Sequence, residues 1–180
     1  MKLAIVLAVI GITVFAGSMS NAYAAVDMFM KIDGVDGESQ KVGHVNEIDV
    51  LSWSWGMSQS ATVAGAGGGK ASVHDFTITK LTDKSTPNLM LDLLSGKHIT
   101  DATFVIRKSG EKPLEYLQIK MTDVIISSIN MGGSSGDDRP TETVTLNFAK
   151  FEVQYVPQKP DGTGDAPVKI GWDIAGNRAT

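Results

Sequence analysis

The sequence predicts an all-β fold with one short helix and about eight or nine strands, arranged as a single barrel or sandwich. Short runs of alternating apolar and polar residues recur from residue 25 onward, separated by turns rich in Gly, Asp and Ser. Only residues 87–95 repeat their apolar side chains at helical spacing. The chain is long enough to bury one core without a metal or a disulfide, and it contains no cysteine.

Residues 1–24 have the three-part layout of a secretory signal peptide. One lysine is followed by an uncharged apolar run over residues 3–17, and Ala22 and Ala24 hold the small-residue positions before a cleavage site. We therefore expect cleavage between Ala24 and Ala25. The run is shorter than the roughly 20 apolar residues that a spanning helix needs, so no stable membrane insertion is expected. A buried N-terminal helix is the alternative.

Residues 25–180 are predicted to form one β domain that begins with a strand over residues 26–32. Met28 and Met30 would share one face of this strand, which should end at the turn signal before Gly34.

A second strand is predicted over residues 45–57, with two different faces. One face would carry Leu51, Trp53, Trp55 and Met57. Val50, Ser52 and Ser54 would lie on the opposite face. The tryptophan face is the pattern expected of a core.

The following segment, residues 58–72, has no apolar periodicity and predicts a long mobile loop unless a partner orders it. It contains Gly65, Gly67, Gly68, Gly69 and Lys70. The segment departs from the P-loop pattern because alanine stands at positions 64 and 71, so no phosphate site or cofactor is predicted.

A strand over residues 73–80 precedes the predicted helix. Thr86 would cap the helix just before Pro87, and Gly96 would end it. The apolar residues at helical spacing are Leu89, Met90, Leu93 and Leu94. A helix of about two turns is unstable alone in water, so it should pack on the sheet.

Further strands are predicted over residues 100–108 and 114–131, joined by a polar hairpin turn. In the next strand the apolar parity changes at residues 149–150, which predicts a β-bulge of the kind that bends a strand toward barrel closure. A last strand is predicted over residues 168–174, and its alternating apolar residues are Val168, Ile170, Trp172 and Ile174.

Composition and spacing disfavour catalysis, metal binding and nucleic-acid binding. The formal net charge is −4 and no basic run is present, unlike a phosphate-binding surface. Ser134 matches the letters of a nucleophile elbow, but a strand follows instead of a helix, so a hydrolase is a weak alternative. His44, His74 and His98 lack metal-ligand spacing, and each is predicted to be a surface or hydrogen-bonded histidine.

The three tryptophans allow a second class of function. Exposed aromatic rings can stack on sugars, so an exported monomeric β-sandwich that binds a carbohydrate or surface ligand is the main alternative. Because Trp53, Trp55 and Trp172 all share a parity with aliphatic residues, packing in the core is the favoured interpretation.

Several ordered blocks resemble the haemolysin-coregulated protein (Hcp) family of type VI secretion. They are DMFMKI (27–32), GES (37–39), IDVLSWSWG (48–56), TK (79–80), DKSTP (83–87), SGKH (95–98), Glu142, VTLNF (144–148), PDG (160–162) and GWDI (171–174). The resemblance spans essentially residues 25–180 and is more specific than any single motif above.

The resemblance implies a small closed β-barrel with one packed helix. It further implies hexameric rings that stack into the inner tube of a secretion machine, together with a spike protein, a contractile sheath and small effectors as partners. The expected location is outside the cell, and the expected role is structural. A signal-like segment is unusual for this family, so either periplasmic export or a start site downstream of Met1 is possible.

Two surfaces are candidates for contacts within such a tube. Ser52 and Ser54 are small and polar, and they are candidates for lining the lumen and contacting effectors. The glycines at 65 and 67–69 with Lys70 are candidates for ring stacking, because the loop is long enough to reach a neighbour.

Overall fold

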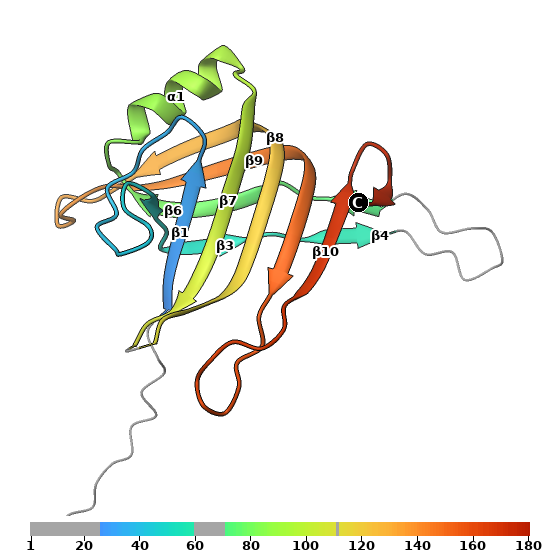
Figure 1. The fold of residues 1–180 in the computed structure, drawn as a ribbon. Coiled ribbons are helices and arrows are strands. Elements are labelled where there is room, and N and C mark those ends of the chain that lie inside the picture. The colour runs from blue at the N-terminus through green and yellow to red at the C-terminus, as the bar shows by residue number, and fades with distance from the viewer. Residues whose placement is uncertain (1–25, 60–70, 111) are drawn as a thin grey trace, which may run out of the picture.

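The computed structural model describes residues 26–59, 71–110 and 112–180 and is mostly β with one short helix, as predicted (Figure 1). The elements are β1 (Val26–Ile32), β2 (Ile48–Asp49), β3 (Ser52–Ser54), β4 (Met57–Gln59), β5 (Ala71–Val73), β6 (Phe76–Leu81), α1 (Thr86–Ser95), β7 (Ile99–Lys108), β8 (Leu114–Gly132), β9 (Thr141–Tyr155), β10 (Val168–Asp173) and β11 (Arg178–Ala179).

One large antiparallel sheet runs in the order β11-β10-β9-β8-β7-β1-β2 and curves around the core (Figure 1). The long strands β8 and β9 pair along most of their length. The other edge of β9 is shared by two strands: β6 pairs with residues 141–146, and β10 pairs with residues 150–155. β6 also pairs with β3, while β4 and β5 form a separate two-stranded hairpin.

Strand pairing does not close this sheet into a continuous barrel. β2 pairs with β1, whereas β3 pairs with β6, and no ladder joins β2 to β3. The two residues between them still bond to both sides, because the Val50 N–H donates to Met28 O at 2.9 Å and the Leu51 N–H donates to Thr79 O at 2.8 Å. The mostly β class is confirmed, and closure in the predicted form is not.

The main core lies inside the curve of the sheet, and α1 packs over one end of it (Figure 1). Its fully buried members come from nearly every long strand and include Met30, Ile48, Phe76, Ile78, Leu89, Phe104, Ile119, Met121, Val144 and Leu146. The helix contributes Leu89, and its C-cap Gly96 adopts a left-handed φ of 61° as the predicted stop requires. Leu94, which shares the predicted helical spacing, is 85% exposed and does not pack inward.

The predicted strand over residues 45–57 is broken into β2, β3 and β4. Each piece pairs with a different partner, so the chain turns between them and the alternation is interrupted. Val50 is therefore 7% exposed, whereas Leu51 and Met57 are 50% and 52% exposed, contrary to the predicted faces. The strand predicted over residues 73–80 is divided in the same way, between β5 and β6.

The change of parity at residues 149–150 is present, but the predicted bulge is not there. The β8–β9 register is the same on both sides, with Thr122 opposite Lys150 and Val124 opposite Phe148, so neither strand gains a residue. Asp123 takes a φ of 54° at this point. On both β8 and β9, the buried side chains switch here from odd to even or from even to odd positions. The register shift lies elsewhere on this pair, between Ile126 and Ser128.

Candidate functional site

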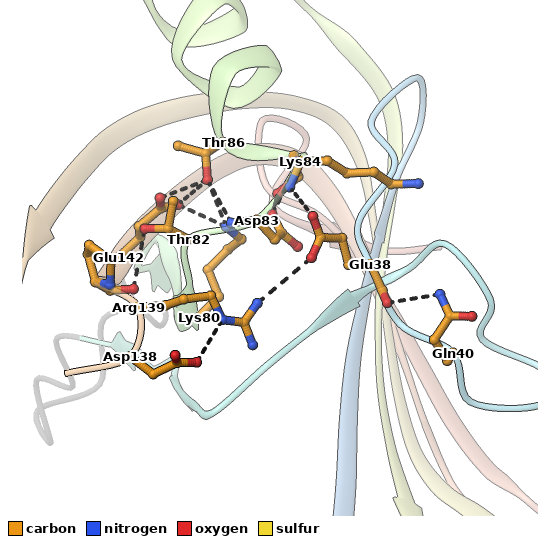
Figure 2. Close-up of polar contacts among 12 residues, drawn as sticks. Glu38, Gln40, Lys80, Thr82, Asp83, Lys84, Thr86, Asp138, Arg139 and Glu142 are labelled. Atoms are coloured by element: carbon orange, nitrogen blue, oxygen red, sulfur yellow. Dashed lines mark hydrogen bonds and ion pairs between the residues drawn. The ribbon is translucent and has the colours of Figure 1, made fainter.

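A buried ionic cluster joins the start of α1 to the sheet (Figure 2). Lys80 on β6 and Glu142 on β9 are opposite each other, are fully buried, and pair at 2.8 Å. Lys80 also contacts Asp83 at 2.9 Å. The Thr86 hydroxyl donates to both carboxylate oxygens of Glu142, at 2.7 and 2.9 Å, and accepts from Lys80 at 3.2 Å. The cluster satisfies both buried charges with protein partners.

The same cluster corrects the predicted helix start. Ser85 is the N-cap residue and makes no side-chain capping bond. Its N–H and hydroxyl donate to the Asp83 carboxylate, while the Thr86 hydroxyl is used by Glu142. The helix is thus positioned by tertiary contacts, in place of the local cap that the sequence suggested.

The rim of the cluster links three segments far apart in sequence (Figure 2). Glu38 accepts the backbone N–H of Lys84 at 3.0 Å, and it pairs with Arg139 at 3.8 Å. Blocks that carry the family resemblance, GES, TK, DKSTP and Glu142, therefore meet in one place. Their contacts indicate that they hold the fold together.

Ser52 and Ser54 lie on a hydroxyl-bearing face of the sheet. Both are exposed, and they stand opposite Thr79 and Thr77 on β6. Trp53, at the intervening position, packs toward the core. The predicted orientation of the two serines is confirmed; their role in a lumen remains a prediction.

This face continues across β9 and β8. Thr77 and Thr79 stand opposite Thr145 and Thr143. The Thr77 and Thr145 hydroxyls lie 3.3 Å apart, and Ser128 on β8 donates to Thr145 at 3.4 Å. Strands β3, β6, β9 and β8 therefore present a contiguous surface of small hydroxyl side chains.

At one end of this surface a carboxylate organises its neighbours. Asp75 accepts hydrogen bonds from the Ser127 hydroxyl at 2.7 Å and from the Asn147 amide at 2.8 Å. The hydroxyl face thus has one acidic margin. Sequence reasoning identified only its β3 edge, because the pairing of β6 with β9 brings together residues nearly 70 positions apart.

The predicted stacking residues Gly65, Gly67, Gly68, Gly69 and Lys70 lie outside the described residues, as do the predicted cleavage residues Ala24 and Ala25. The structure does describe the base of the loop. There β4 and β5 pair, with Met57 opposite Val73 and Gln59 opposite Ala71.

An apolar groove of about 560 Å³ lies between the β4–β5 hairpin and β10. Met57 and Val73 line one side, and Ile170 and Trp172 line the other. Ile170 is 59% exposed and Val168 is 63% exposed, so the predicted alternation does not turn these two side chains into the core. Trp172 and Ile174 do pack against the core, because only that end of β10 reaches it.

Trp53 on β3 and Trp55 just after it pack against the core, as predicted. The Trp53 ring lies 5.1 Å from Phe104, and the Trp55 ring meets Phe151 edge-on at 4.8 Å. The Trp55 indole N–H donates to His74 O at 3.0 Å. Rings held in this way cannot offer a stacking platform, so the carbohydrate-binding alternative is not supported.

The histidines are dispersed and engaged in local contacts, as predicted. His98 is exposed and bonds Asp123 at 2.7 Å, and His74 lies 3.5 Å from the Ser58 hydroxyl. His44 is buried and bonds Glu47 at 2.8 Å. Among the described residues, no three or more His, Cys, Asp or Glu side chains have an arrangement that could hold a metal ion.

Ser134 lies in an exposed turn between β8 and β9. Its N–H and hydroxyl both donate to Asp137 at 2.8 Å, and these bonds hold the pKa of Asp137 below its usual range. A strand follows the turn, so the strand-to-helix geometry of a nucleophile elbow is absent from this described segment. In the described part of the chain, no helix is long and apolar enough to cross a membrane.

Comparisons with known proteins agree along most of the domain. A family model described as "Type VI secretion system effector, Hcp" matches residues 29–155. Protein hcp1 of Pseudomonas aeruginosa is 55% identical over 158 residues, which cover 85% of this chain and 98% of that protein.

Solved structures show the same similarity. A type VI secretion system effector from Yersinia pestis is 43% identical with a TM-score of 0.70, and the match covers 82% of this chain and 100% of that one. Hcp1 from Salmonella typhimurium is 36% identical with a TM-score of 0.71, covering 87% and 99%. A further type six secretion system protein reaches a TM-score of 0.81 at 29% identity, covering 87% and 100%.

Proposed function

The chain belongs to the Hcp family of type VI secretion proteins, and from that membership we propose that it is a structural tube subunit that forms stacked hexameric rings. The high identity to a relative over nearly that relative's whole length carries the proposal. The spike protein, the contractile sheath and small effectors are the proposed partners. The role is structural, and no residue is assigned to catalysis.

A ring needs a heterologous contact, in which one surface of each subunit meets a different surface of the next. The apolar groove beside β10 supports this step, because its lining residues Ile170 and Met57 are each more than half exposed, and exposed apolar patches often mark protein interfaces. We assign the groove to the contact between neighbouring subunits.

Native mass spectrometry of wild type and Ile170→Asp tests the ring. Wild type should give a mass of six subunits, and the variant should give monomers because a charge would enter the apolar contact. Leu94→Asp is the matched control: Leu94 is 85% exposed and lies on α1, away from the groove, so hexamers should persist. Wild type that remains monomeric at micromolar concentration would contradict the proposal.

The hydroxyl face is proposed to line the lumen, with Ser52 and Ser54 contacting effectors. Hydroxyl side chains can donate and accept hydrogen bonds in any rotamer, so such a surface can contact varied cargo without a fixed pattern. Ser54→Arg should leave the thermal unfolding midpoint close to wild type, because Ser54 is exposed, while changing which effectors are retained. A large fall in that midpoint would show that Ser54 is needed by the fold.

Stacking is proposed to use Gly65, Gly67, Gly68, Gly69 and Lys70, since the β4–β5 hairpin supports the segment that contains them. We also propose that the sheet functions as a closed barrel. The segment from β2 to β3 supports this, because its backbone bonds to β1 on one side and β6 on the other.

The functional form is proposed to begin at or near Ala25 and to leave the cell through type VI secretion. The signal-like pattern of residues 1–24 supports removal, because an apolar segment on every subunit would favour aggregation of rings. N-terminal sequencing of assembled rings tests this, and Met1 or Lys2 at that terminus would contradict it.

A further inference from the structure

The segment between β1 and β2, residues 33–47, covers a patch of sheet outside the main core and is called the strap below. Phe29 and Val105 are opposite each other on β1 and β7 and are 1% and 4% exposed, yet neither belongs to the main core. His44 of the strap, 4% exposed, stacks on Phe29 with ring centroids 3.9 Å apart and nearly parallel planes. The strap therefore shields this patch from water.

The strap has internal backbone bonds that make it a unit. The Gly37 N–H donates to Asn46 O at 2.7 Å, the Asn46 N–H donates to Ser39 O at 2.9 Å, and the Ser39 N–H donates to Glu47 O at 3.0 Å. Segments held in this way open and close cooperatively. Opening of the strap therefore exposes these three amides to exchange together.

Both ring nitrogens of His44 face carboxylate oxygens. Nδ1 lies 2.8 Å from Oε2 of Glu47 within the strap, and Nε2 lies 3.3 Å from Oε1 of Glu115 on β8. The second contact is poorly aligned for a hydrogen bond, so it acts mainly through charge. A neutral imidazole carries one N–H and presents a lone pair at the other nitrogen, so only the imidazolium suits both carboxylates.

The other cations near the strap already share a partner. Arg107 on β7 lies over the Phe29 ring, 5.0 Å from its centroid, and pairs with Asp27 at 3.1 Å. Lys41 of the strap also pairs with Asp27, at 3.2 Å. Glu47 and Glu115 therefore face His44. The three carboxylates of Asp27, Glu47 and Glu115 are balanced by Lys41, Arg107 and His44 only when His44 is protonated.

We propose that the strap is a proton-controlled latch, held against β1, β7 and β8 while His44 carries both ring protons and loosened when one is lost. Loss of the Nε2 proton would aim a lone pair at the Glu115 carboxylate and remove one attachment between strap and sheet. The attachment therefore weakens as pH rises. An open strap uncovers Phe29 and Val105.

Hydrogen–deuterium exchange of the full chain at pH 5.5 and pH 8, corrected for intrinsic exchange rates, tests the latch. Protection of the strap amides, including Ser39 and Asn46, should fall by about fivefold relative to the amides of β8 and β9 at the higher pH, the scale of one partly exposed ion pair. This relative fall should be absent in His44→Gln. It should also be reduced in Glu115→Gln, whose side chain is 50% exposed and therefore dispensable for folding.

His98→Gln is the control, because the His98–Asp123 pair is exposed and distant in sequence from the strap; it should retain the wild-type response. Equal strap protection at the two pH values in wild type would overturn the latch. So would an unchanged response in Glu115→Gln, even if His44→Gln failed to fold.

Discussion

Glu142→Ala would leave Lys80 buried beside a single remaining carboxylate. The change removes the 2.8 Å ion pair and the two hydrogen bonds from Thr86, at a site where both charged side chains have no solvent exposure. Breaking a buried pair in this way costs about 3–5 kcal/mol. For a domain of this size that corresponds to a fall in the midpoint of thermal unfolding of roughly 6–20 °C.

Differential scanning calorimetry at one fixed protein concentration measures this change, because assembly also shifts the midpoint. Asp165→Ala is the matched control: it removes an exposed pair with Lys159, 3.6 Å apart, and should cost less than about 1 kcal/mol. Lys80→Met combined with Glu142→Leu should recover part of the loss, since apolar replacement of a buried pair is often neutral but Asp83 loses its cation here. A midpoint for Glu142→Ala as close to wild type as the control would refute this account of the cluster.

Three further outcomes are expected. Burial raises the pKa of Asp27, but hydrogen bonds from Arg107, Ser109 and Lys41 outweigh burial and hold this pKa below 3.8. Asp27→Asn should therefore destabilise the protein at neutral pH. Thermal unfolding from pH 2.5 to 7 should show the difference from wild type vanish as acid protonates Asp27. Gly37→Ala should cost about 1–3 kcal/mol in urea unfolding because a Cβ would collide with the Glu47 carbonyl, whereas Gly132→Ala meets open space and serves as control. Deleting residues 65–69 should leave hexamers intact in native mass spectra but shorten stacks seen by electron microscopy; loss of the hexamer would contradict the stacking assignment.

Local patterns in the sequence predicted the elements whose neighbours are regular. The bounds of β1 are as expected, and β8 continues without a break to Gly132. The inward Trp53 and outward Ser54 also follow from simple alternation. Breaks in alternation at β2, β3 and β4 were missed because they are set by three different partner strands, and local periodicity contains no information about those partners.

The buried charges left a signal that alternation alone can detect. Lys80 lies on the same face of its strand as Ile78, and Glu142 lies on the same face as Val144. Alternation alone therefore places both charged side chains toward the core. Two opposite charges at inward positions predict a pair, since an unpaired buried charge is too costly. His44 gave no comparable signal, because its contacts arise where a loop packs on a strand.

The pairing order has a consequence for synthesis of the chain. β1 pairs with β7, and β6 pairs with β3 and β9, so the N-terminal strands lack their main partners until much later segments emerge. About a hundred residues separate β3 from the end of β9, which is roughly 5–20 s of translation at ordinary bacterial rates. During that interval Trp53, Phe76 and Ile78 have no core to enter. Newly made chains should therefore depend on chaperones that bind exposed apolar strands, and slowing translation over β7 and β8 should increase their aggregation.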